Sequence, residues 1–169
     1  MDKRQTKFEA LAMPHLDAAY SLARWLSRSP ADAEDIVQEA LLRAFRAFDA
    51  VREGAVRPWL MTIVRNCWRD HAAKARRCES ADEAAVEQLT FDGPSPEAEA
   101  ENASERRRLD RMLALLPDDY REVLLLREME DMSYREISQA IDAPIGTVMS
   151  RLARARALLK DKWLAEGAR

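Results

Sequence analysis

Apolar residues recur every three to four positions along most of this chain, a spacing that predicts a succession of amphipathic helices. The clearest pattern lies near the C-terminus, in residues 132–160. There Ser133 and Glu136 form a capping-box pattern, and the helix that they begin is expected to end near Ile141. Residues 142–144, Asp-Ala-Pro, then predict a turn, because the residue before a proline is pushed out of helical geometry.

A second helix is expected to begin near Ile145, and its two faces differ in character. One face is an apolar seam, and the other carries Arg, Ser and Thr side chains, which can reach base edges in a DNA major groove. Two helices joined by a short turn, the second one basic, are the layout of a DNA-binding helix-turn-helix. A solvated charged face on an ordinary helical hairpin is the alternative for the face alone. The candidate contacts are Thr147, Ser150, Arg151, Arg154 and Arg156.

The N-terminal part of the chain predicts three or four more helices, the first of them broken near Pro14. Ser29 and Pro30 are typical of a helix start, as a cap and a first helical residue. The helix that follows, to about Phe48, has one apolar face and one polar stripe. Within this stripe Leu42 is ringed by charges, which suits a protein-binding surface as well as a solvated face. The stripe consists of Asp35, Gln38, Glu39, Leu42, Arg43 and Arg46.

A further helix is expected from Pro58 to about Arg76, with a continuous apolar stripe on one side. Its outer face is basic and includes an asparagine, so that it could contact nucleic acid. A solvated amphipathic helix is the commoner explanation of such a face. The outer-face candidates are Arg65, Asn66, Arg69, Lys74, Arg76 and Arg77.

Composition and charge divide the chain into two helical parts. With only 4 glycines among 169 residues and few β-branched runs, the composition favours an all-α fold. The net charge of −3 is unevenly distributed, since residues 76–103 carry eight acidic and two basic side chains and contain two prolines close together. We therefore predict two small helical domains, at 6–77 and 104–165, joined by a flexible acidic linker at 78–103.

Several classes of protein are disfavoured by what the sequence lacks. It contains no apolar run long enough to span a bilayer and no signal-peptide core, so we expect a cytoplasmic protein. Cys67, His71 and Cys78 supply only three metal ligands, without a CxxC or HxxxH pair, and the first two fall on an apolar stripe. There is also no glycine-rich phosphate loop and no GxSxG. We expect neither an enzyme nor a protein with a metal or other cofactor.

Three blocks of the sequence resemble bacterial sigma factors of the extracytoplasmic-function (ECF) type, in the order and spacing of that family. These blocks are DAEDIVQEALLRAF at 32–45, RPWLMTIVRNCWRDHAAKARR at 57–77 and residues 116–159. The resemblance implies that the stripe around Leu42 docks on core RNA polymerase. It implies that the outer face of residues 57–77 opens the −10 promoter element, and that the helix-turn-helix reads the −35 element. The acidic linker resembles the segment that threads the RNA channel of the polymerase.

The resemblance also implies partners: core RNA polymerase, promoter DNA and an anti-sigma factor of unknown identity. Two rival hypotheses stay open on the sequence. One is a sigma mimic that titrates an anti-sigma factor without binding DNA, although such a module would have lost the basic residues that persist here at Arg151, Arg154 and Arg156. The other is a stand-alone helix-turn-helix regulator, which would leave the first two blocks without a role.

Overall fold

The structure, a computed structural model, describes residues 3–79 and 98–167, and within these ranges the secondary structure is entirely helical. This confirms the predicted all-α fold. The helices of the N-terminal unit are α1 (Lys3–Ala12), α2 (Leu16–Ser27), α3 (Pro30–Ala47) and α4 (Val56–Glu79), with short 3₁₀ turns at Met13–His15, Phe48–Ala50 and Glu53–Ala55. Those of the C-terminal unit are α5 (Ala98–Ala114), α6 (Asp118–Glu128), α7 (Tyr134–Ile141) and α8 (Ile145–Gly167).

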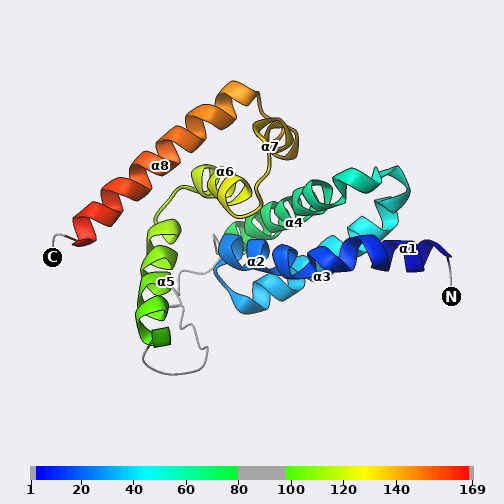
Figure 1. Ribbon diagram of the computed structural model, residues 1–169, viewed down its shortest axis with the longest axis horizontal. Coiled ribbons are helices and arrows are strands. Elements are labelled where there is room, and N and C mark those ends of the chain that lie inside the picture. The colour runs from blue at the N-terminus through cyan, green and yellow to red at the C-terminus, as the bar shows by residue number, and fades with distance from the viewer. Residues whose placement is uncertain (1–2, 80–97, 168–169) are drawn as a thin grey trace.

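In the N-terminal unit, α2, α3 and α4 pack against one another (Figure 1). Leucine, isoleucine and alanine side chains make up much of the core between them. The break near Pro14 is confirmed as the 3₁₀ turn between α1 and α2. The predicted start of α3 is confirmed as well, because the Ser29 hydroxyl accepts a hydrogen bond from the backbone of Asp32, with Pro30 as the first helical residue. Helix α4 begins at Val56, two residues before the predicted start.

The C-terminal unit contains the predicted helix-turn-helix as α7 and α8. Both hydrogen bonds of the capping box are present at Ser133 and Glu136. Helix α7 ends at Ile141, and Asp142 adopts a left-handed conformation with φ of 51°, which turns the chain into α8. The predicted apolar seam of α8 faces α6 and α7 and is buried at Val148, Leu152 and Ala155.

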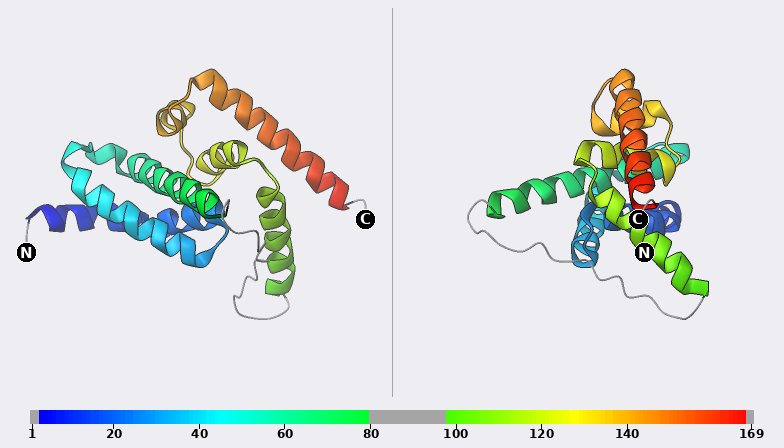
Figure 2. Two further views of the ribbon diagram at one scale, coloured as in Figure 1. Left: turned by 180° about the vertical axis from the view of Figure 1, so that it is seen from behind. Right: turned by 90° about the vertical axis from the view of Figure 1, so that its left-hand side faces the viewer.

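The two units lie against each other. Helix α6 contacts α2, and α7 contacts α4, so that segments far apart in the sequence are neighbours (Figure 2). The long α8 runs along the outer side of the C-terminal unit, away from α3 (Figure 1). Buried side chains of both units belong to one hydrophobic cluster, in which Trp68 of α4 is only 3% exposed. This arrangement brings the outer face of α4 close to the helix-turn-helix.

Most of the predicted linker, residues 80–97, lies outside the described part of the chain. Its two edges are helical, since α4 continues to Glu79 and α5 already begins at Ala98. None of the helices in the described ranges is both long and apolar enough to cross a membrane.

Candidate nucleic-acid and protein interfaces

The outward face of α8 presents polar side chains near the start of the helix. Ser150 and Arg154 are exposed, and Arg154 has no ion-pair partner among the described residues. Thr147 is half-buried and accepts, through its carbonyl, a hydrogen bond of 3.1 Å from the Ser150 hydroxyl. Arg156 instead pairs with Glu128 of α6 at 2.6 Å. The predicted face therefore divides into residues that are open to a ligand and residues that are engaged within the protein.

The polar stripe of α3 lies on the surface of the N-terminal unit. Leu42 is 54% exposed in the middle of it, as the sequence pattern predicts. Arg43 pairs with Glu39 at 2.7 Å and with Asp70 of α4 at 2.7 Å, and these hydrogen bonds raise the pKa of its guanidinium. An exposed leucine beside a fixed set of charges is typical of protein-binding surfaces, where an apolar anchor is surrounded by a polar rim.

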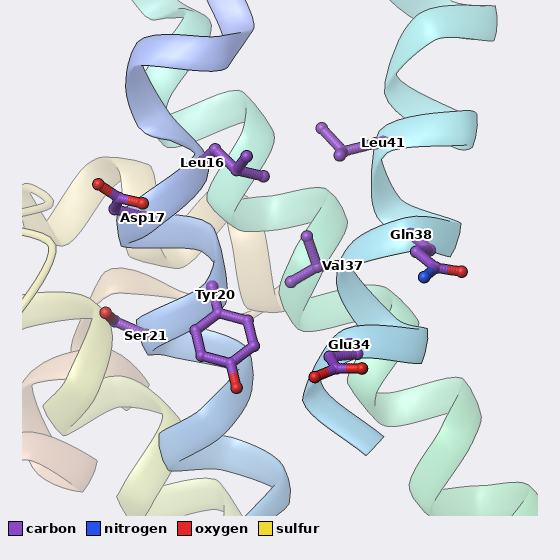
Figure 3. A pocket seen from close by; sticks show the side chains of 8 residues that line it. All are labelled: Leu16, Asp17, Tyr20, Ser21, Glu34, Val37, Gln38 and Leu41. Atoms are coloured by element: carbon purple, nitrogen blue, oxygen red, sulfur yellow. The ribbon is translucent and has the colours of Figure 1, made fainter. Parts of the chain in front are cut away.

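A groove of about 600 Å³ runs between α2 and α3, next to this stripe. Figure 3 shows Leu16, Tyr20, Val37 and Leu41 facing one another across it. Gln38, a predicted site residue, belongs both to the groove and to the polar stripe. The sequence pattern does not reveal this groove, because the same apolar residues also satisfy the pattern of an ordinary core face. The remaining lining residues are Asp17, Ser21 and Glu34.

The outer face of α4 is only partly open to solvent. Asn66, Lys74, Arg76 and Arg77 are exposed. Arg76 lies 3.6 Å from Asp118 of α6. Arg65 and Arg69, by contrast, have side chains that are 14% and 27% exposed. The sequence pattern placed both arginines on a solvent-facing side of the helix, and only the packing of the C-terminal unit covers them.

Arg65 and Arg69 converge on the carboxylate of Glu122, which is completely buried. The Arg65 Nε and Nη2 atoms donate to Glu122 Oε2 and Oε1 at 2.9 and 3.2 Å. The Arg69 Nε and Nη2 atoms donate to the same two oxygens at 3.1 and 2.7 Å. Paired donation of this kind is the strongest geometry that an arginine and a carboxylate adopt.

Two more side chains complete this group. Asp119 accepts a hydrogen bond from Arg69 and lies 3.1 Å from Arg151 of α8, while Arg151 also lies 3.8 Å from Glu122. Its partners lower the pKa of Asp119, chiefly through the Arg69 hydrogen bond. Against the lowering effect of burial, hydrogen bonds to Glu122 and Asp119 raise the pKa of the Arg69 guanidinium. We call Arg65, Arg69, Asp119, Glu122 and Arg151 the interdomain ion-pair cluster.

The residues considered as metal ligands have other surroundings. Cys67 is buried in the core of the N-terminal unit, and this burial raises the pKa of its thiol to about 11. His71 Nε2 lies 3.8 Å from an Asp32 oxygen, and Cys78 is exposed further along α4. Within the described ranges, no group of three or more His, Cys, Asp or Glu side chains has an arrangement suited to a metal ion.

Comparison with known proteins assigns both units to one family. Residues 11–78 match region 2 of the sigma-70 family, and residues 106–159 match its region 4. The ECF RNA polymerase sigma-E factor of Escherichia coli (strain K12) is 36% identical over 140 residues, which cover 78% of this chain and 73% of the relative. The chain belongs to the ECF RNA polymerase sigma factors. The corresponding factor of Haemophilus influenzae is 33% identical over 150 residues, 83% of this sigma factor and 78% of the relative.

Two solved structures share the arrangement of both units. The sigma factor RpoE of Bartonella quintana, solved in complex with the anti-sigma factor NepR, has a TM-score of 0.80 and 26% identity, covering 93% of this chain and 96% of that one. CnrH, solved in complex with the cytosolic domain of CnrY, has a TM-score of 0.68 and 25% identity, covering 95% and 90%. The resemblance inferred from the three sequence blocks is thereby confirmed.

Proposed function

We propose that this ECF sigma factor binds core RNA polymerase through α3, opens the −10 element of its promoters with α4, and reads the −35 element with α7 and α8. The single observation that carries the proposal is the pair of separate surfaces on the two units: an exposed leucine in a polar stripe on one, and a helix-turn-helix with an outward Arg154 on the other. We place its action in the cytoplasm, where bacterial core polymerase works, and assign it no catalytic group.

The polymerase-binding surface is proposed to consist of Asp35, Gln38, Glu39, Leu42, Arg43 and Arg46. Leu42 supplies the apolar anchor, and the groove beside Gln38 offers a hollow for a side chain of the partner. Arg43 is held between Glu39 and Asp70, so that the polar rim is ordered before a partner arrives. An ordered rim reduces the side-chain entropy that is lost on binding.

The promoter contacts are proposed to come from both units. Thr147, Ser150, Arg151, Arg154 and Arg156 would reach the −35 element from α8, since α-helices of this motif enter the major groove with their N-terminal part. The −10 contacts would be Arg65, Asn66, Arg69, Lys74, Arg76 and Arg77 on α4. We retain the division into two domains joined by an acidic linker. We also propose an anti-sigma factor as a partner, because the B. quintana relative was solved with one.

The proposal is tested by measuring both polymerase binding and transcription. Purified core polymerase is mixed with the wild-type protein, and bound protein and protein-dependent transcripts from genomic promoter fragments are measured. Leu42→Asp should abolish co-elution with core polymerase, because it places a charge at the centre of an apolar contact. Loss of a central anchor at an interface typically costs 2 kcal/mol or more, a reduction in affinity of at least about 30-fold.

The matched control is Leu164→Asp, which makes the same substitution at an equally exposed leucine, 58% exposed, near the end of α8. This variant should bind core polymerase like the wild type. Normal polymerase binding by Leu42→Asp would refute the assignment of the α3 surface. Wild-type protein that neither binds core polymerase nor yields transcripts would refute the proposed function and favour a sigma mimic.

A further inference from the structure

The two units are too close together in this structure to engage both promoter elements at once. Arg69 of α4 and Arg151 of α8 both contact the carboxylate of Asp119. The −10 and −35 elements are about 25 base pairs apart, roughly 85 Å of straight duplex at about 3.4 Å per base pair. If these arginines bind the two elements, as proposed above, the units must separate before the protein engages a promoter.

Separation of the units has to break the interdomain ion-pair cluster. Five hydrogen bonds from Arg65 and Arg69 to the carboxylates of α6 join α4 to the C-terminal unit. Arg65 Nη1 also donates a hydrogen bond of 3.4 Å to the carbonyl oxygen of Ala140, a buried residue near the end of α7. A guanidinium that donates two bonds to a carboxylate uses the same geometry with which it binds a phosphate. The α6 carboxylates therefore occupy the donor groups that a DNA backbone would use.

The charges of the cluster hold the two units together, but a competing partner can displace the contacts between them. Three guanidinium groups surround two carboxylates, so the positive charge is in excess and the group still attracts an anion. Glu122 is fully buried, and burial of charges in a low-dielectric site offsets much of their attraction. Such an arrangement favours one geometry without a large net gain in free energy. A polymerase or a DNA phosphate backbone that binds the open form can then displace the ion pairs between the units.

We propose that Asp119 and Glu122 act as an internal substitute for DNA phosphate, holding the free protein in a closed arrangement in which Arg65 and Arg69 are withheld from promoter DNA. The inference rests on the proposed DNA-binding role of these two arginines. The closed arrangement resembles that of the B. quintana sigma factor, which was solved with an anti-sigma factor and which matches 93% of this chain. In the present chain the contacts that stabilise this arrangement come from its own side chains.

Asp119→Asn and Glu122→Gln test the proposal. Each removes one carboxylate charge and leaves three guanidinium groups around a single carboxylate, which should open the protein. If the closed form makes up about 90% of the free protein, opening raises the apparent DNA affinity up to about tenfold. The measurements are the radius of gyration from small-angle X-ray scattering and the affinity of the free full-length protein for a fluorescent mixed-sequence DNA duplex. Both variants should have a larger radius and bind the duplex more tightly than the wild type.

Asp131→Asn is the matched control. It also removes one negative charge from the C-terminal unit, but Asp131 is 91% exposed and pairs with Arg127 of the same unit at 3.7 Å. Its backbone has a positive φ of 51°, which asparagine tolerates well. This variant should keep the radius of the wild type and change duplex affinity by less than about twofold, the effect of one exposed charge.

The outcomes separate the proposal from its alternatives. Variants that stay as compact as the wild type refute the cluster as the contact that closes the protein. Variants that expand without a gain in duplex affinity refute the withholding of the arginines. Asp119 is half-exposed, so Asp119→Asn decides the question should circular dichroism show that Glu122→Gln has lost helix. Failure of the proposed sigma function would instead appear as the absence of transcripts with the wild-type protein, whatever its radius of gyration.

Discussion

Individual residues of the candidate sites differ in how readily the sequence reveals them. Leu42 was recognisable, because an apolar residue in a stripe of charges breaks the pattern of a solvated face. Arg154 was recognisable from its position opposite the apolar seam of α8. Glu122 was missed as a site residue. It stands three and four positions before Leu125 and Leu126, and hence on the same buried face, which is a signal that could have found it.

At this scale we predict that Arg154→Ala lowers transcription from the promoters that the wild type uses, while binding to core polymerase is unchanged. Loss of an arginine that contacts a base typically costs about 1–3 kcal/mol, or about 5- to 150-fold. Arg154 is exposed and makes no ion pair in the described part of the chain, so its removal should leave the fold intact. The measurement is the yield of promoter-specific transcript at a fixed polymerase concentration.

Arg106→Ala in α5 serves as the comparison for Arg154→Ala. Arg106 is exposed and belongs to the same unit, so this variant loses the same charge away from α8. Equal reductions in the two variants would mean that overall charge, and not base contact by α8, supports transcription. A selective loss in Arg154→Ala assigns the contact to the face of α8.

Among the elements, the helix-turn-helix was the most accurately predicted. Its first helix begins at a capping box and ends at a residue with left-handed geometry before a proline, and all of these are local signals. The start of α3 at Ser29 was predicted for the same reason. Helix ends without a side-chain cap were placed less well, as at α4, whose first helical residue is Val56. Helix α5 begins within the range that its acidic composition assigned to the linker.

The capping box makes a quantitative prediction. Ser133→Ala removes the acceptor for the Glu136 backbone N–H, now 3.2 Å away, and should lower the free energy of unfolding by about 1 kcal/mol. The decrease is measured by urea unfolding followed by circular dichroism. Ser133→Thr keeps an acceptor at this position and should retain most of the stability. Similar losses in both variants would show that the hydroxyl group does not stabilise α7.

At the scale of the whole molecule, the structure joins two units that the sequence presents as separate. The prediction of two domains rested on composition, and composition contains no information on how two folded units pack. The described residues form one hydrophobic cluster that runs through both units, with Trp68 of α4 near Arg121 of α6. Burial lowers the pKa of the Arg121 guanidinium, which is only 3% exposed.

The closed arrangement should depend on pH through Asp119. Arg69 of α4 and Arg151 of α8, with Arg65 further away, lower the pKa of this carboxyl below its ordinary value of 3.8. Its contribution to the closed form is therefore present above this value and is lost as the pH falls through the lower pKa of the closed form. We expect the radius of gyration to stay constant from pH 7 to about pH 5 and to rise at still lower pH.

The control for the pH experiment is Asp119→Asn, in which the group that titrates is absent. Its radius should already be large at neutral pH and should change less on acidification than that of the wild type. Circular dichroism at each pH separates opening of the units from loss of helix. An equal acid-induced expansion in both proteins would show that Asp119 does not control the closed arrangement.

The sequence by itself determined the helices, their caps, the buried seams and the order of the family blocks, because these depend on neighbours within one or two helical turns. It also determined which side chains have the chemistry to bind DNA or a protein partner. Only the tertiary structure decided which of those side chains are available. Arg65, Arg69 and Arg151 lie on outward faces of their own helices, and they are engaged because two carboxylates more than 45 residues from Arg69 pack against them. Charge pairing across such distances follows from how helices pack within and between the units, which no local pattern encodes.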